Sequence, residues 1–375
     1  MHICFVFRRR VPDTGSTAVS EYARHLAANG DDVSFIGGTD GESVEKDTWN
    51  GVDVWRIPTD LSTALSISPV RFAYRSAKLL RRYPELRDVD VVYMHGFPGL
   101  GPALRLPGVD IPTIADIRGT AVSNQLLERV SHLGIRLQRH VVDRTTVLDD
   151  RVATRIFGRD HGLDVVPLGA DFDIFSPSGQ TQRPTGVPSD SPLIGYVGRL
   201  HPSRDLDRLV ASFAEFVCAD LDAHLAIIGD GEARRELKAT SKRLGVTDRV
   251  HLPGPVAHHQ IPDYLRGFDV VAGYVADKPQ YRYQPPIKTI EALATARPTV
   301  LTSTPGNQQF YTGDNALVAP DTPSEYGSAL ETLIESPATR EELRSNARES
   351  VKRFDYENIV KNDLRPVLRK TAKSG

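Results

Sequence analysis

Short apolar segments alternate with amphipathic segments along most of the chain. In the first half, the predicted strands are rich in β-branched and aromatic residues and cover positions 2–7, 32–36, 52–57, 89–95, 112–116, 145–148 and 164–167. Between the first two strands, Val19, Tyr22 and Leu26 recur at the spacing of one helix face. Strands that alternate with helices in this way predict a parallel α/β sheet.

The alternation stops at residues 176–192, which read SPSGQTQRPTGVPSDSP. A stretch rich in Pro, Gly and Ser without apolar periodicity is typical of an exposed linker. Strands are predicted again at 193–197, 224–228, 250–252, 269–274 and 299–302. We therefore predict an α/β chain with two doubly wound, Rossmann-like domains, residues 1–175 and 193–355. The helical pattern of residues 356–375 predicts a C-terminal helix that is able to pack back on the first domain.

The composition fits an ordinary globular protein, with 40% hydrophobic and 25% charged residues. The 46 Lys and Arg nearly balance the 48 Asp and Glu, so no global positive field favours nucleic acid as a partner. Cys4 and Cys218 each lie in an apolar run, which indicates buried thiols in a reducing compartment rather than a disulfide or a zinc site. No signal segment and no run of about 18 apolar residues is present. We expect a cytoplasmic protein.

The strongest local signal directly follows the predicted strand 193–197. Gly198 permits a tight turn there, and Arg199 and Arg204 then place two guanidinium groups in one loop. Two such cations suit a diphosphate group. Taken alone, the two arginines fit solvated loop positions as well.

A second signal is the segment PPIKTIEALATARPTV, residues 285–300. Proline suits the first positions of a helix, so the amides of Ile287 and Lys288 are expected to be free donors for an anion. Glu291 lies one turn inside, where its carboxylate is able to accept two ribose hydroxyls. The ordinary alternative is that Glu291 only favours the helix dipole.

Five segments follow one another along the chain, namely VVPLGAD at 165–171, GYVGRL at 195–200, LAIIGDG at 225–231, VHLPG at 250–254 and the segment at 285–300. In this order they resemble the family 4 retaining glycosyltransferases of GT-B fold. The resemblance covers about residues 160–305, whereas the N-terminal half is similar more loosely, through the loop at Gly15 and the sequence YMHG at 93–96. It implies two Rossmann-like domains that face a cleft.

The resemblance implies a set of site residues. Arg199 and Arg204 contact the donor diphosphate, Glu291 holds the ribose, and the backbone from Gly254 to Val256 lies near the base. The implied donor-binding residues are Gly15, Gly198, Arg199, Arg204, Gly254, Val256, Ile287, Lys288 and Glu291, and the implied catalytic residues are Arg199, Arg204, His95 and Asp116. Arg204 stands where the family usually has lysine, and Tyr283 stands where it often has a second glutamate.

The function implied is a retaining hexosyltransferase that moves a sugar from a UDP or GDP type donor to a glycan or lipid-linked acceptor. It needs no cofactor and no metal, and the number of Asp-x-Asp triplets, four, is close to that expected by chance from the composition. Tyr283 leaves open a nucleotide-sugar-binding pseudoenzyme, and a GT-B sugar-nucleotide epimerase is the second alternative.

One basic segment lies outside these motifs. Arg71, Arg75, Lys78 and Arg82 recur at helical spacing, and no acidic residue occurs between Asp60 and Glu85. Such a helix is able to rest on the anionic, cytoplasmic face of a membrane. The ordinary alternative is a solvated basic face.

Overall fold

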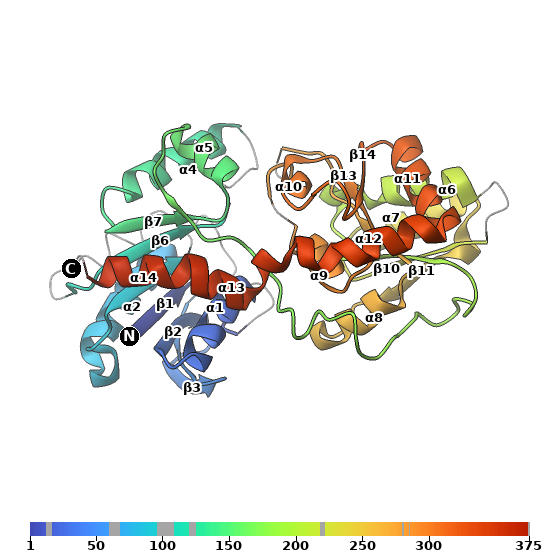
Figure 1. Cartoon of the computed structure of the whole chain (residues 1–375). Coiled ribbons are helices and arrows are strands. Elements are labelled where there is room, and N and C mark those ends of the chain that lie inside the picture. The colour runs from blue at the N-terminus through green and yellow to red at the C-terminus, as the bar shows by residue number, and fades with distance from the viewer. Residues whose placement is uncertain are drawn as a thin grey trace. The chain divides into compact units, whose positions relative to one another are not determined.

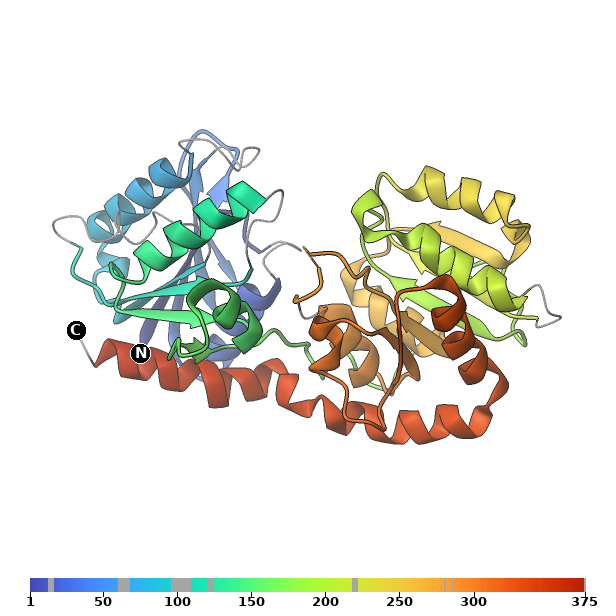
Figure 2. The ribbon, with the colours of Figure 1, turned by 90° about the horizontal axis from the view of Figure 1, so that it is seen from above.

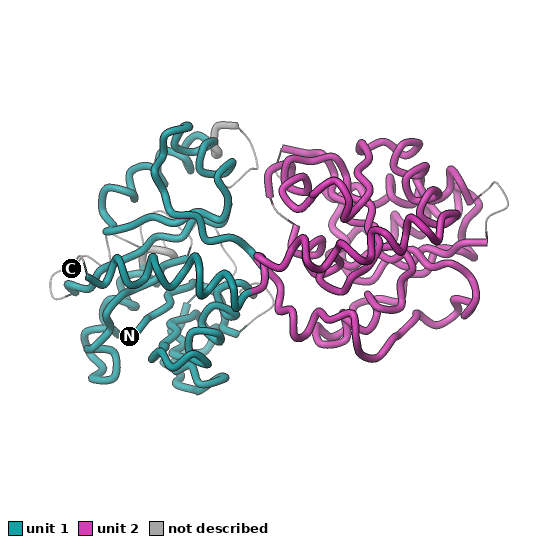
Figure 3. The backbone as a smooth tube through the Cα atoms, in the orientation of Figure 1, with its two compact units in different colours: residues 1–168, 356–375 teal, residues 169–355 magenta. Residues whose placement is uncertain are grey.

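A computed structural model describes residues 1–12, 17–59, 68–95, 109–119, 125–217, 222–279, 281–284 and 286–373. It divides the chain into two compact units (Figures 1 and 3). Unit 1 consists of Met1–Leu168 and Tyr356–Gly375, and unit 2 is Gly169–Asp355. The chain therefore passes from one unit to the other twice.

Unit 1 is built on one large sheet, in which the described strands have the order β3-β4-β2-β1-β5-β6-β7-β8. All neighbours in this sheet are parallel except β3 and β4. After β1 the chain builds the sheet outward on one side and then returns to add β5 on the other side, so the order reverses between β1 and β5. The strands are β1 (His2–Phe7), β2 (Asp32–Thr39), β3 (Glu45–Trp49), β4 (Val52–Pro58), β5 (Val91–His95), β6 (Thr113–Ile117), β7 (Arg144–Val147) and β8 (Asp164–Val165).

Both faces of this sheet are covered by helices. In β1, Ile3 and Phe5 point into one core cluster, whereas Cys4 and Val6 point into another on the opposite face. Burial raises the pKa of the Cys4 thiol, which agrees with its predicted role as a buried apolar residue, and Cys218 lies outside the described residues. The first half contains the helices α1 (Thr17–Ala28), α2 (Ser68–Arg82), η2 (Pro84–Leu86), α4 (Gln125–Gln138) and α5 (Asp150–Phe157).

The C-terminal residues complete unit 1. They form α13 (Tyr356–Ile359), the π-helical turn η7 (Val360–Leu364) and α14 (Arg365–Ala372). These elements pack on the face opposite to α2, as Figure 2 shows. The Tyr356 ring contacts Tyr22 edge-on at a centroid distance of 5.7 Å, and Arg144 Nε donates to Thr371 Oγ1 over 3.0 Å.

The expected linker at 176–192 is wrong, because this segment is part of unit 2. Its Gln182 amide donates to the Asp263 carbonyl over 2.9 Å, and the Gln182 side chain donates to Tyr264 Oη over 2.8 Å. A Cβ atom on Gly267 would lie only 2.0 Å from the Gln182 carbonyl oxygen. The segment is thus packed along α8 (Ile261–Gly267), and the chain changes unit earlier, after Leu168.

Unit 2 has a sheet of entirely parallel strands in the order β11-β10-β9-β12-β13-β14. The order reverses between β9 and β12, which makes this the point where α/β sheets bind ligands, beyond the carboxyl ends of the strands. The strands are β9 (Leu193–Val197), β10 (His224–Ile228), β11 (Val250–Gly254), β12 (Val270–Gly273), β13 (Thr299–Thr302) and β14 (Leu317–Ala319).

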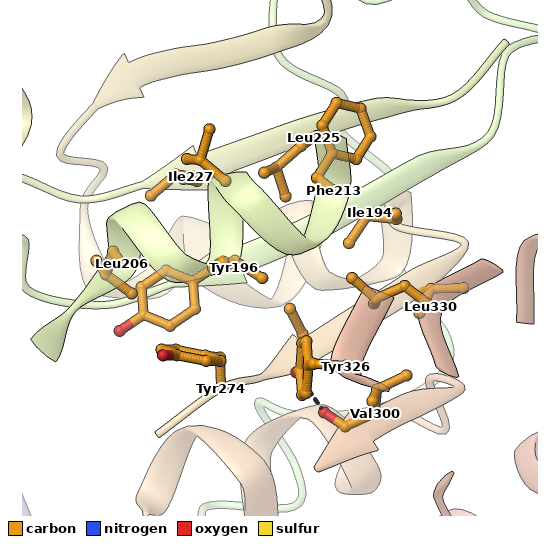
Figure 4. Packing of buried hydrophobic residues seen from close by; sticks show 14 of the residues in the cluster. Ile194, Tyr196, Leu206, Phe213, Leu225, Ile227, Tyr274, Val300, Tyr326 and Leu330 are labelled. Atoms are coloured by element: carbon orange, nitrogen blue, oxygen red, sulfur yellow. Dashed lines mark hydrogen bonds between the residues drawn. The ribbon is translucent and has the colours of Figure 1, made fainter. Parts of the chain in front are cut away.

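Helices and an aromatic-rich core hold the unit 2 sheet. Figure 4 shows part of this core, in which the Tyr326 hydroxyl donates to the Val300 carbonyl over 2.8 Å. The expected pair of doubly wound α/β domains is confirmed. The helices are η3 (Pro202–Arg204), α6 (Leu206–Val217), α7 (Arg234–Arg243), η4 (Thr247–Arg249), η5 (His258–Gln260), α8, α9 (Ile287–Ala294), α10 (Pro305–Gln308), α11 (Pro323–Glu335), α12 (Pro337–Ser350) and η6 (Lys352–Phe354).

Among the described residues, no helix combines the length and the apolar character that a bilayer crossing requires.

Candidate functional site

The loop after β9 is fixed against the loop after β10. The Gly198 amide donates to the Ile228 carbonyl over 3.0 Å, and the Leu200 amide donates to the Asp230 carbonyl over 2.9 Å. Gly229 has φ +143°, and a Cβ atom there would lie 1.8 Å from the Gly198 oxygen. Only glycine permits this close approach. The loop that carries Arg199 is therefore held in one place at the β9–β12 reversal point.

Arg204 ends the short helix η3 and interacts with two tyrosines. Its guanidinium carbon is 5.2 Å from the centre of the Tyr281 ring, a distance typical of a cation–π contact. Burial raises the pKa of Tyr196, and the adjacent Arg204 offsets part of this rise. Arg204 is thus held by aromatic groups instead of by a carboxylate.

The segment between β12 and α9 is attached to the same loop. Lys278 Nζ donates to Asp205 Oδ1 over 2.6 Å, and the Tyr281 hydroxyl lies 2.5 Å from Ser203 Oγ. Sequence reasoning missed these contacts. The sequence marked only Asp205, as part of an Asp-x-Asp triplet. In the structure Asp205 adopts φ +47°, an uncommon conformation for a residue other than glycine.

Asp321 fixes the beginning of that segment. Its carboxylate accepts a hydrogen bond from the Tyr274 hydroxyl over 2.7 Å and from the Asp277 amide over 2.9 Å. Burial raises the pKa of Tyr274, and the hydrogen bond to Asp321 raises it further, so Tyr274 stays a neutral donor. Residues 274–279 and 281–284 are therefore anchored at Asp321 on one side and at Ser203 and Asp205 on the other.

Helix α9 begins at Ile287, after Pro286, without a side chain that caps its first amides. Glu291 is only 2% exposed. The Lys288 ammonium lies 2.9 Å from Glu291 Oε2, but it donates its hydrogen bond to Oε1 over 3.2 Å, and Oε2 has no hydrogen-bond partner among the described residues. Oε2 faces the Lys288 ammonium but accepts no hydrogen bond from a described residue, so it keeps acceptor capacity for a hydroxyl or amide of a ligand.

Two arginines at this edge lack a close carboxylate partner among the residues the structure describes. Arg199 is 70% exposed, and its nearest carboxylate, Glu232, is 3.9 Å away. Arg204 has no ion pair with any described carboxylate. In contrast, three cations nearby are paired within 3.0 Å, Lys278 with Asp205, Arg282 with Asp277 and Lys288 with Glu291. Arg234, beside Gly254, donates to the Leu252 carbonyl. Arg199 and Arg204 are thus cations of the loop after β9 that are available to an anionic ligand.

Gly254 and Val256 follow β11 at the same edge. Gly254 has φ +101°, and its carbonyl accepts from the Gly229 amide over 3.0 Å. Val256 is half-buried against the core. The carboxyl edge of the unit 2 sheet therefore carries eight of the predicted residues, namely Gly198, Arg199, Arg204, Gly254, Val256, Ile287, Lys288 and Glu291. Tyr283 lies half-buried in the segment that leads to α9, and Gly15 lies outside the described residues.

His95 and Asp116 belong to unit 1, where they are paired in register at the carboxyl ends of β5 and β6. Asp116 is 1% exposed and accepts hydrogen bonds from Arg118 Nε over 2.6 Å and from Thr146 Oγ1 over 2.9 Å. His95 Nδ1 lies 3.3 Å from Asp116 Oδ2. Burial acts to raise the pKa of Asp116, but Arg118 and His95 outweigh it, so the pKa of this carboxyl lies below its usual value.

Of this pair, only His95 reaches the surface, with 18% of its side chain exposed. Its ring meets the Phe7 ring edge-on at 4.5 Å between centroids. In the described structure Asp116 is a partner of Arg118 and His95, and it acts on any ligand through them.

Family models match both halves of the chain. The model described as "Glycosyl transferase 4-like domain" matches residues 14–169, and the model described as "Glycosyl transferases group 1" matches residues 191–336.

Curated relatives are similar over shorter stretches. A D-inositol 3-phosphate glycosyltransferase of Xylanimonas cellulosilytica is 30% identical over 221 residues, which cover 55% of this chain and 51% of the relative. An alpha-D-kanosaminyltransferase of Streptomyces kanamyceticus is 29% identical over 161 residues, which cover 42% of this chain and 40% of the relative. The matches thus span about half the length of these relatives or less.

Solved structures show the same fold over the whole chain. Sucrose-phosphate synthase from Thermosynechococcus elongatus has a TM-score of 0.80 at 17% identity, with 100% of both chains covered. Anabaena HepE in complex with UDP has a TM-score of 0.74 at 17% identity, with 99% of this chain and 100% of that chain covered. The fold is that of the GT-B glycosyltransferases. Because glycosyltransferase family models match both halves of the chain, the chain belongs to the glycosyl transferases group 1 family.

Proposed function

We propose that this protein transfers a hexose from a nucleoside-diphosphate sugar to an acceptor hydroxyl, with retention of the anomeric configuration and without a metal ion or another cofactor. One observation carries the proposal. At the reversal point of the unit 2 sheet, two arginines without a close carboxylate lie at the same edge as a buried carboxylate with an unfilled acceptor oxygen. These are the groups that a diphosphate and a ribose require.

The reaction breaks the bond between the anomeric carbon and the diphosphate and forms a bond from that carbon to the acceptor oxygen. Negative charge grows on the departing diphosphate, where Arg199, Arg204 and the first amides of α9 stabilise it. The acceptor proton passes to the departing phosphate oxygen, as the family resemblance implies. The family resemblance implies a role for His95 near the reacting sugar, and Asp116 would orient its ring.

A UDP donor is supported by the neighbours. Anabaena HepE was solved with UDP, and an E. coli structure titled trehalose-6-phosphate was solved with UDP-2-fluoro glucose. A panel of UDP-, GDP- and ADP-sugars tests the donor by thermal shift, because a ligand at 100 times its Kd adds about 2.7 kcal/mol to the free energy of unfolding.

The transfer itself is tested with the donor that this panel selects. We expect activity to survive EDTA, because two arginines and a helix start stabilise the leaving group in place of a cation. The NMR spectrum of the product should show the anomeric configuration of the donor. Complete loss of activity with EDTA that Mg²⁺ or Mn²⁺ restores would contradict this mechanism.

Tyr283 favours one alternative, a protein that binds a nucleotide sugar without transferring it. The structure places Tyr283 in the anchored segment before α9, where a glutamate is common in the family. Donor binding without release of nucleoside diphosphate would support this alternative. Recovery of an epimerised donor would instead indicate the epimerase.

Glu291→Gln is expected to keep the fold and weaken donor binding by about 10- to 100-fold, because hydrogen bonds to a charged acceptor contribute about 1.5–3 kcal/mol. Calorimetric titration of both proteins with a ribose donor and with its 2′-deoxy analogue checks this. The two proteins should bind the analogue with nearly equal affinity. If the two proteins differ in affinity for the 2′-deoxy analogue as much as for the ribose donor, Glu291 does not bind the ribose and acts only on the helix dipole.

We infer that a lipid-linked acceptor is reached through contact with an anionic membrane. In α2, Arg71, Arg75, Lys78 and Arg82 are exposed, and Tyr74, on the same side of the helix, is 52% exposed. Helix α4 adds an apolar stripe, in which Val130, Leu133 and Leu137 are 60%, 57% and 59% exposed.

Both helices lie on the same face of the unit 1 sheet. Ala115 of β6 packs in the α2 cluster, and Ile117, two positions on and so on the same face, packs with Ile135 of α4. A cationic helix beside an exposed apolar stripe is typical of a surface that binds anionic lipid.

The protein is therefore expected to co-sediment with anionic vesicles at low salt, since each cation near such a surface contributes about 1 kcal/mol. Added salt should release it, and neutral vesicles should not retain it. The double variant Arg75→Glu, Lys78→Glu should lose vesicle binding and keep transfer to a soluble acceptor analogue. The control Arg235→Glu, Lys238→Glu reverses two exposed charges of α7 and should leave binding unchanged. Absence of vesicle binding at low salt would show that the basic face of α2 is only a solvated surface.

A further inference from the structure

A cavity of about 250 Å³ lies beside α2 in unit 1. Its walls come from α2, from the end of β4 and from the turn before β3. Since β2 separates β4 from β1, the cavity is at a different part of the sheet from His95 and Asp116. Neither the family motifs nor the proposed transfer uses it.

One wall of the cavity is cationic. Arg75, Lys78 and Arg82 line it together with a single carboxylate, Glu42. No described carboxylate forms an ion pair with any of the three cations, and Arg75 is fixed by a hydrogen bond to the Pro58 carbonyl. The lining therefore keeps a surplus of positive charge.

The neighbouring acid does not cancel this charge. Glu85 pairs with Lys46 at 3.2 Å, and Lys46 lies 4.7 Å from the centre of the Trp55 ring. A hydrogen bond to its own backbone amide and the Lys46 ammonium hold the pKa of Glu85 below its usual value. Glu85 is thus an ionised group that already has a cationic partner.

Most of the remaining lining is apolar. It consists of the buried side chains of Ile57 and Leu79, the Tyr83 ring, and Val44, which is 41% exposed. Val44 is one of the few large apolar side chains that the described surface leaves open. A ligand of the cavity therefore needs a compact anionic group and an adjacent hydrocarbon part.

We propose that this cavity binds a phosphate monoester that carries an apolar chain. Guanidinium groups bind phosphate through two parallel hydrogen bonds, and an ammonium adds a point charge. The same chemistry occurs in an anionic lipid headgroup and in a free phosphate ester. The proposal rests on the cavity, and it stands whether or not the proposed transfer activity is correct.

The probe is dihexanoyl phosphatidic acid, kept below its aggregation concentration and titrated calorimetrically into the full chain. We expect saturable binding with one site, weaker binding of inorganic phosphate and no binding of dihexanoyl phosphatidylcholine. Lys78→Met and Arg82→Gln should each weaken the binding about tenfold, because each removes one charge-assisted hydrogen bond.

Two control variants separate a defined site from general attraction. Arg71→Gln removes an exposed charge of the same helix that does not line the cavity, and it should leave the affinity unchanged. Val44→Asn should weaken binding of the phosphatidic acid and leave binding of inorganic phosphate unchanged. Equal losses in Arg71→Gln and Lys78→Met would overturn the proposal.

Vesicles that contain phosphatidic acid identify the source of the ligand. Binding of both the soluble ester and the vesicles, lost in Lys78→Met, supports the site and indicates a lipid headgroup. Binding of the soluble ester without vesicle retention supports the site and indicates a free phosphate ester, and it would count against the membrane contact proposed above. Vesicle binding without binding of the soluble ester would overturn the cavity site and leave the membrane contact standing.

Discussion

Arg204→Ala is expected to lower kcat by about 10²- to 10³-fold, the loss typical of removing one group that stabilises charge in a transition state. The same loss is expected for Arg199→Ala. Both arginines lack a close carboxylate among the described residues, so their charge is free to oppose the charge that grows on the diphosphate. Steady-state kinetics and titration with the bare nucleoside diphosphate measure the two effects, and both kcat and affinity should fall.

Two further variants test this assignment. Arg204→Lys keeps the charge that the family usually has at this position and should retain more activity than Arg204→Ala. Arg235→Ala removes an exposed arginine of α7 and should leave kcat unchanged. Diphosphate affinity equal to that of the wild type in both alanine variants would refute the phosphate role of Arg199 and Arg204.

Asp116→Asn is expected to destabilise unit 1 by about 3–5 kcal/mol. The amide retains the shape of the carboxylate, but it leaves the side chain of Arg118, which is 10% exposed, without its charge partner. A chain of two units need not unfold in one transition, so the measurement is hydrogen exchange of the β5 and β6 amides. Asp160→Asn changes an exposed aspartate of the same unit and should shift stability by less than about 0.5 kcal/mol.

The contribution of Asp116 to the stability of the wild type depends on pH. Folding lowers the pKa of Asp116, so its contribution to stability is complete above the unfolded carboxyl pKa of about 4 and is lost as the pH falls through the lower folded value. Protection of the wild-type amides should therefore decrease below about pH 4, and Asp116→Asn should lack this part of the decrease. Parallel pH profiles for the two proteins would show that Asp116 is not the ionised partner of Arg118.

Local patterns were sufficient to predict the sheets, because the parallel strands are buried on both faces and read as continuous apolar runs. Strand β3 was missed, since its sequence EKDTW is a polar, largely exposed edge that pairs only with β4. The linker was misplaced for another reason. Its Pro- and Gly-rich sequence shows turns, whereas the partners that bury it, at Asp263 and Tyr264, lie about 80 positions further along the chain.

The candidate site, like the fold, could be predicted from the sequence only in part. Arg199, Arg204 and Glu291 each belong to a short motif, so the sequence was enough to single them out. The contacts that hold this part of the site could not be predicted from the sequence, because they join distant positions. Lys278 and Asp205 are 73 positions apart, and Tyr274 and Asp321 are 47 apart. Sequence patterns identify the groups that meet a ligand, but the contacts that orient those groups depend on distant segments.

The return of the C-terminal residues to unit 1 has a consequence for synthesis. The core of unit 1 includes Tyr356, Ile359, Leu364 and Leu368, which leave the ribosome only after all of Gly169–Asp355. Throughout the synthesis of unit 2, unit 1 therefore exposes the apolar surface that these residues later cover. The nascent chain is therefore expected to complete unit 1 only after all of unit 2 has been synthesised, unlike the usual N-terminal order, and chaperones are expected to bind the uncovered surface meanwhile.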